Sequence, residues 1–129
     1  MLHNHTSGTP LPNPKDITNL LKCRIIDSGI VGDYGFLNMN NSFKKINFSD
    51  NELNKIRIKA DEMRNKLQKK AFAHNPNLKY ESKKLKEKIK YKYIKENINN
   101  IIKEYNLEFK QYGIEFIYIP YKLKRDDFS

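Results

Sequence analysis

Three side chains near the amino end have the types and the spacing of metal ligands. His3 and His5 stand two residues apart, and Asp16 follows in the next segment of the chain. Side chains two apart on an extended strand project from the same face, so both imidazoles can reach one ion. Two imidazoles and one carboxylate leave the fourth position of a tetrahedral zinc open for water, as in catalytic sites. We therefore expect His3, His5 and Asp16 to bind Zn²⁺.

Asp16 also has a purely structural interpretation. The segment Asn13-Pro14-Lys15-Asp16 is typical of a helix start, with Asn as N-cap, Pro at the first position and an acid at the third. Asp16 would then be the acid of a capping box. The buried face of this short helix, which ends near Lys22, would be Ile17, Leu20 and Leu21. A further alternative is a flexible amino end with two chance histidines.

This opening resembles the metal motif of the JAMM metalloproteases, also called JAB or MPN domains. That motif is His-x-His, seven residues, Ser, two residues, Asp, and this chain has His3-x-His5, seven residues, Asn13-x-x-Asp16. The stretch from Ile26 to Phe36 resembles the strand, turn and strand that follow the motif in the RadC-like branch and in related domains of phages and toxins. The turn itself is indicated by Gly32-Asp33-Tyr34-Gly35.

The resemblance implies zinc-dependent hydrolysis of a peptide or isopeptide bond on a cytidine-deaminase-like core. Asn13 replaces the family serine and would donate a hydrogen bond to the oxyanion, and Thr6 replaces the family proline. The family's general base is a glutamate upstream of the histidines, whereas the first glutamate here is Glu52. We therefore expect an N-terminally truncated domain that is weakly active or inactive alone.

The second half of the chain is predicted to be helical. Ser49-x-x-Glu52 is a capping box, and apolar residues at three- and four-residue steps then predict a helix over 50–72. A second helix is predicted over 80–111 with a bend near Asn97, followed by a strand over 114–119. The predicted class is α+β. Residues 1–48 form the C-terminal part of a JAMM-like metal-binding domain, and residues 49–129 form a basic helical region with a terminal strand.

The charge of the chain suggests a second class of function. The formal net charge is +10, and the stretch from Lys79 to Lys95 has eight lysines against two glutamates, interleaved with Tyr80, Tyr91 and Tyr93. Lysines with aromatic rings bind phosphates and stack on bases. The alternatives to the hydrolase are therefore a protein that binds nucleic acid or another polyanion through this stretch, and a phage- or toxin-associated interaction protein. The plainest interpretation is a solvated helix face.

Cys23, His74 and the hydropathy of the chain bear on further classes of site and on location. Cys23 is the only cysteine, which excludes an internal disulfide and a cysteine zinc cluster, and we expect it to be a small buried residue. His74 stands in a predicted loop, apart from the other histidines. No apolar run reaches the length of a membrane span and no signal peptide opens the chain, so a cytoplasmic or phage- or effector-associated location is expected.

Overall fold

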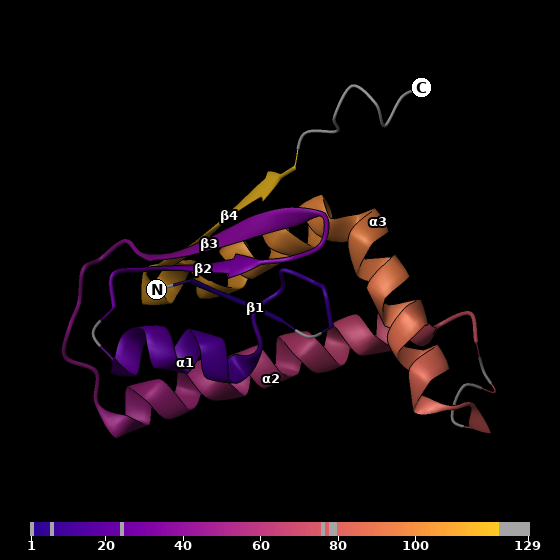
Figure 1. Ribbon diagram of the computed structural model, residues 1–129. Coiled ribbons are helices and arrows are strands. Elements are labelled where there is room, and N and C mark those ends of the chain that lie inside the picture. Colours follow the sequence, from indigo (N-terminus) through magenta and orange to yellow (C-terminus); the bar gives the residue numbers. More distant parts are fainter. Residues whose placement is uncertain (1, 6, 24, 76, 78–79, 122–129) are drawn as a thin grey trace.

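An α+β fold is built around one four-stranded sheet, as the sequence predicts for the class (Figure 1). The computed structural model describes residues 2–5, 7–23, 25–75, 77 and 80–121. In chain order the elements are β1 (Leu2–Asn4), α1 (Pro14–Lys22), β2 (Asp27–Val31), β3 (Gly35–Asn41), α2 (Asp50–Phe72), α3 (Lys83–Phe109), the 3-10 turn η2 (Lys110–Tyr112) and β4 (Ile114–Pro120).

The strands lie in the order β1-β2-β3-β4. β1 runs parallel to β2, with α1 as the crossover between them, whereas β2, β3 and β4 are antiparallel neighbours. The turn predicted at Gly32–Gly35 joins β2 to β3, and the Gly32 N–H donates to the Gly35 carbonyl at 2.8 Å. β4 comes from the region 49–129 and pairs with β3 of the region 1–48, so the two regions share one sheet.

All three helices contribute to the hydrophobic core on one face of this sheet. Along β3 the buried residues alternate with half-buried ones, which places Leu37 and Met39 on the helix-covered face. Ile30, Ile114, Phe116 and Leu11 also belong to the core, and the helices supply Ile17, Leu20, Leu21, Ile56, Ala60, Met63, Ile94, Ile98, Ile101, Ile102, Tyr105 and Phe109. Figure 1 shows α1 and α2 together on the same side of the strands.

The helix predicted over 50–72 is confirmed as α2, and its capping box is present between Ser49 and Glu52. The helix predicted over 80–111 begins later, at Lys83, because Ser82 caps it. The predicted bend is at Asn97, whose φ of −118° and ψ of 16° are not helical. Its side-chain amide donates to the Tyr93 carbonyl at 2.9 Å, the acceptor that the regular backbone ladder would use.

The bend turns the first part of α3 away from the sheet (Figure 1). Leu85, predicted to belong to the apolar side of this helix, is therefore 38% exposed. Cys23 is also exposed rather than buried, so that prediction is wrong. The residue follows the last helical position of α1, beyond the buried stripe that ends at Leu21. None of the helices that the structure describes has an apolar stretch long enough to cross a membrane.

Candidate metal centre

His3 reaches the helix-covered side of the sheet because of its register in β1. It pairs with Ile30 of β2, which is fully buried on that side. Its neighbours in the strand, Leu2 and Asn4, are exposed. His5 follows two residues later and points the same way, as the period of an extended strand requires. The imidazole of His5 is more enclosed than that of His3, with side-chain exposures of 15% and 34%.

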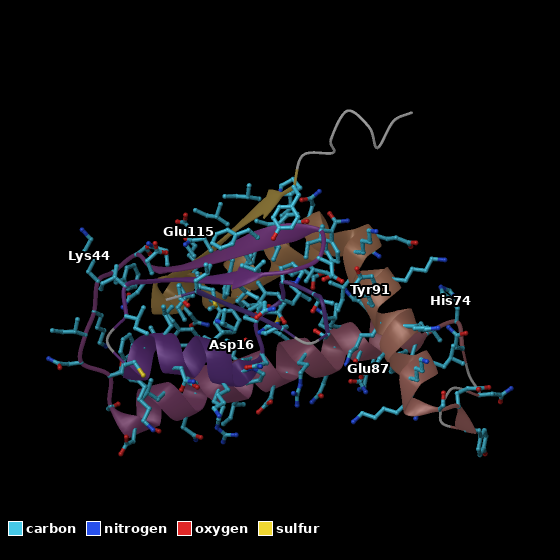
Figure 2. The ribbon with its side chains drawn as sticks, in the orientation of Figure 1. Asp16, Lys44, His74, Glu87, Tyr91 and Glu115 are labelled. Atoms are coloured by element: carbon cyan, nitrogen blue, oxygen red, sulfur yellow. The ribbon has the colours of Figure 1, made fainter. Side chains whose placement is uncertain are left out.

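Asp16 comes to the same place through the start of α1. Asn13 is the N-cap, Pro14 follows it, and the predicted capping box is present in both directions. The Asp16 N–H donates to Asn13 Oδ1 at 2.8 Å, and the Asn13 N–H donates to Asp16 Oδ2 at 2.9 Å. The cap therefore fixes the carboxylate at the amino end of the helix, where Figure 2 labels it.

The polar ends of the three side chains converge at short distances. His5 Nε2 lies 2.9 Å from Asp16 Oδ2, His3 Nε2 lies 3.2 Å from Asp16 Oδ1, and the two Nε2 atoms lie 3.2 Å apart. Ligands about 2.0 Å from a tetrahedral zinc are separated by roughly 3.3 Å. The two imidazoles contact different oxygens of the carboxylate, and one ligand atom from each of the three residues lies within 4.8 Å of the other two. The individual contacts are close to the separation of neighbouring ligands on one ion, and the donor set is one that zinc accepts.

The contact of Nδ1, the second ring nitrogen of His5, determines which nitrogen can face a metal ion. Nδ1 lies 3.2 Å from the backbone carbonyl of Thr9. A carbonyl only accepts, so Nδ1 carries a proton, and when the ring is neutral the lone pair is on Nε2 and faces the cluster. Hydrogen bonds of this kind hold metal-bound imidazoles in one orientation and make them more basic.

The electrostatics of the metal-free cluster favour a charged pair. The hydrogen bond that His5 donates to the Asp16 carboxylate raises the pKa of His5, although burial acts in the opposite direction. Burial also opposes the charged form of Asp16, but the bonds from His5 and from the Asn13 backbone outweigh it and lower the pKa of that carboxyl. The protein thus keeps a carboxylate at the point where a cation would be bound.

The loop between His5 and α1 is packed, although it is rich in Gly and Pro. Thr9, Pro10, Leu11 and Pro12 are all buried. Gly8 adopts a left-handed φ of +80°, and its carbonyl accepts from the Asp33 N–H at 2.7 Å. The two stretches on which the family resemblance rests, the histidine loop and the turn at Gly32–Gly35, are therefore in contact. The predicted turn role of Asp33 is also its observed one.

A cleft of about 1160 Å³ opens beside the cluster. One side consists of the segment around the cluster, including His5 and Asn13. The opposite sides are α2, through Arg64 and Leu67, and the first part of α3, which contributes Lys83, Lys84, Glu87, Lys88, Lys90, Tyr91 and Ile94. Figure 2 shows Glu87 and Tyr91 on this part of α3. The bend at Asn97 makes the first part of α3 one wall of the cleft. The sequence pattern alone did not connect this part of the helix with the histidines.

The cluster does not include His74, the third histidine of the chain. Among the described residues, the group of potential metal ligands that lie close together consists of His3, His5 and Asp16. His74 is exposed beyond the end of α2 (Figure 2). Lys79, the first residue of the predicted basic stretch, lies outside the described residues. Thr9 was missed as the partner of His5, because a backbone carbonyl has no sequence signal.

Comparisons of this chain with models of protein families, with curated proteins and with solved structures found no match.

Proposed function

We propose that this chain is a zinc-dependent hydrolase of peptide or isopeptide bonds, of the JAMM type. The observation that carries the proposal is the convergence of His3, His5 and Asp16 within 3.2 Å of one another. The spacing of the three residues in the sequence and its resemblance to the JAMM motif support the same function. A bound zinc would polarise a water molecule and the scissile carbonyl.

The residues of the chain have separate roles in this proposal. His3, His5 and Asp16 would hold the ion, with Thr9 fixing the orientation of His5. Asn13 lines the cleft beside them. Its Oδ1 is used by the helix cap, so its Nδ2 amide is the group that would donate to a developing oxyanion.

Proton transfer is the step with no assigned group. Within the described residues, Asp16 is the only carboxylate of the cluster, and it is itself a proposed ligand. General-base help contributes about 100-fold or more to such reactions. We therefore expect the chain by itself to bind zinc and to hydrolyse amides slowly or not at all.

Metal content of the purified chain tests the proposal most directly. The protein is loaded with zinc, freed of excess ion and analysed by inductively coupled plasma mass spectrometry, beside His3→Ala, His5→Ala and Asp16→Asn variants. We expect one zinc per chain, and loss of that zinc in each variant. Substitution by cobalt adds an independent measurement, because a tetrahedral site gives intense visible absorption that an octahedral aqua ion does not.

His74→Ala is the matched control, because it removes the third histidine, which lies outside the cluster. It should retain the full metal content. Zinc retained equally by His5→Ala and Asp16→Asn, or lost equally in His74→Ala, would contradict the proposal.

A further inference from the structure

The cleft beside the cluster has a strongly unbalanced charge. Its cationic side chains are Arg64, Lys83, Lys84, Lys88 and Lys90, and among the described residues that line it the only acidic one is Glu87. Glu87 already lies 3.5 Å from Lys90, and Arg64 lies 3.7 Å from Asp61. Within the described residues, no carboxylate forms an ion pair with Lys83, Lys84 or Lys88. These three lysines are exposed and available to a ligand.

The lysines stand on the face of α3 that the bend turns toward the cluster. Lys84, Lys88 and Tyr91 follow one another at helical steps of four and three residues, and all three line the cleft with His5 and Asn13. This wall of the cleft is therefore a row of cations, and the proposed zinc ligands lie on the opposite side. A ligand that pairs with the whole row has to carry several negative charges along its length.

Polypeptide fits this cleft better than single-stranded nucleic acid. Binding of a single strand relies on aromatic rings that are free to stack on bases. The two tyrosine rings that line the cleft already have other contacts or are buried. Tyr91 donates to Asp33 Oδ2 at 3.1 Å and packs edge-on against Tyr34, whereas Tyr105 is only 3% exposed. What remains accessible along this wall is charge on flexible lysine side chains.

We propose that the cleft binds a polypeptide segment rich in aspartate and glutamate, held by Lys83, Lys84 and Lys88. The inference rests on the proposed function, because it gives the substrate class of that site: an acidic segment whose scissile amide lies at His3, His5 and Asp16. The carboxylates of the segment would pair with the lysines while its backbone continues past Asn13.

Fluorescence anisotropy on the full chain in EDTA tests the lysine wall without the metal. The probes are a labelled glutamate-glycine peptide, a lysine-glycine peptide of equal length and a labelled oligo-dT strand. The variant Lys83→Gln/Lys84→Gln/Lys88→Gln removes the wall while retaining good helix formers. The control Lys55→Gln/Lys66→Gln/Lys69→Gln removes the same charge from exposed positions of α2 that do not line the cleft.

We expect the glutamate peptide to bind and the lysine peptide not to bind. The wall variant should weaken binding about tenfold, since each exposed ion pair contributes about twofold, and the control variant should not. Equal weakening by both variants, or no binding of the glutamate peptide, would overturn the inference. Tighter binding of oligo-dT that only the wall variant abolishes would overturn it in favour of nucleic acid. Zinc content is measured separately. A chain that binds zinc but does not discriminate between the peptides leaves the hydrolase proposal standing and overturns the inference. A chain that binds the glutamate peptide but no zinc refutes the hydrolase proposal, and with it the role of the acidic segment as a substrate.

Discussion

His5 Nδ1 donates a hydrogen bond to the backbone carbonyl of Thr9, at 3.2 Å. The contact joins an imidazole of the candidate metal centre to a buried residue of the loop that follows it. It leaves Nε2 facing Asp16 and His3. The orientation of one proposed ligand is thus fixed by main-chain geometry, and metal binding at this cluster would require an intact loop.

Asp16 has two roles that substitution can separate. Asp16→Asn keeps an oxygen that can accept from the Asn13 N–H but removes the negative charge, whereas Asp16→Ala removes both. We expect both variants to lower zinc affinity by about 100-fold or more, since each weakens or removes a ligand. Only Asp16→Ala should lose the helix-start bond, at roughly 0.5–1 kcal/mol of unfolding free energy.

The two effects are measured by zinc titration calorimetry and by urea unfolding of the metal-free variants. Equal stability loss in Asp16→Asn and Asp16→Ala would show that the cap does not contribute through this bond. Unchanged zinc affinity in both would remove Asp16 from the ligand set.

Asn13 caps α1 through its side-chain oxygen, so substitutions of this residue should change the free energy of unfolding according to whether they keep a capping oxygen. Asn13→Ser introduces the serine that the JAMM motif has at this spacing and keeps a capping oxygen, and we expect stability within about 0.5 kcal/mol of the parent chain. Asn13→Ala loses the bond to the Asp16 N–H and should cost about 1 kcal/mol. Urea unfolding of the three chains measures this, and an Asn13→Ala variant as stable as Asn13→Ser would contradict it.

Gly32 is the point where the histidine loop meets the β2–β3 turn. A Cβ added there would lie 2.8 Å from the ring nitrogen and from Cδ of Pro10, so the loop must shift. We expect Gly32→Ala to lower the unfolding free energy by about 1–3 kcal/mol and to weaken zinc binding, although residue 32 contacts no ligand. Cys23→Ala is a control at an exposed position and should change neither quantity. Full zinc affinity in Gly32→Ala would show that the loop position does not control the cluster.

Tyr105 gives a pH dependence that is independent of the metal. Burial raises the pKa of this phenol from 10.0 to about 12. The unfolded chain therefore loses this proton first as the pH rises, and the stabilising contribution, fully present below pH 10, is lost between pH 10 and 12. The slope is about 1.4 kcal/mol per pH unit for one group. Urea unfolding at stepped alkaline pH should show this extra decline in the parent chain and not in Tyr105→Phe; parallel curves would refute it.

The sequence alone determined the local parts of this protein. The helix start at Asn13–Asp16, the capping box at Ser49–Glu52 and the turn at Gly32–Gly35 each depend on residues three apart, which the local geometry of the backbone brings together. The period of an extended strand likewise placed His3 and His5 on the same side.

Only the tertiary structure decided how these parts meet. The pairing of β4 with β3 and the packing of Gly8 against Asp33 join residues far apart in the chain, and such contacts have no periodic signal. The bend at Asn97 was expected as a weak point of the helix, but its direction is seen only in the tertiary structure. That direction makes the first part of α3 a wall of the cleft, leaves Leu85 exposed and sets the lysines across from His5.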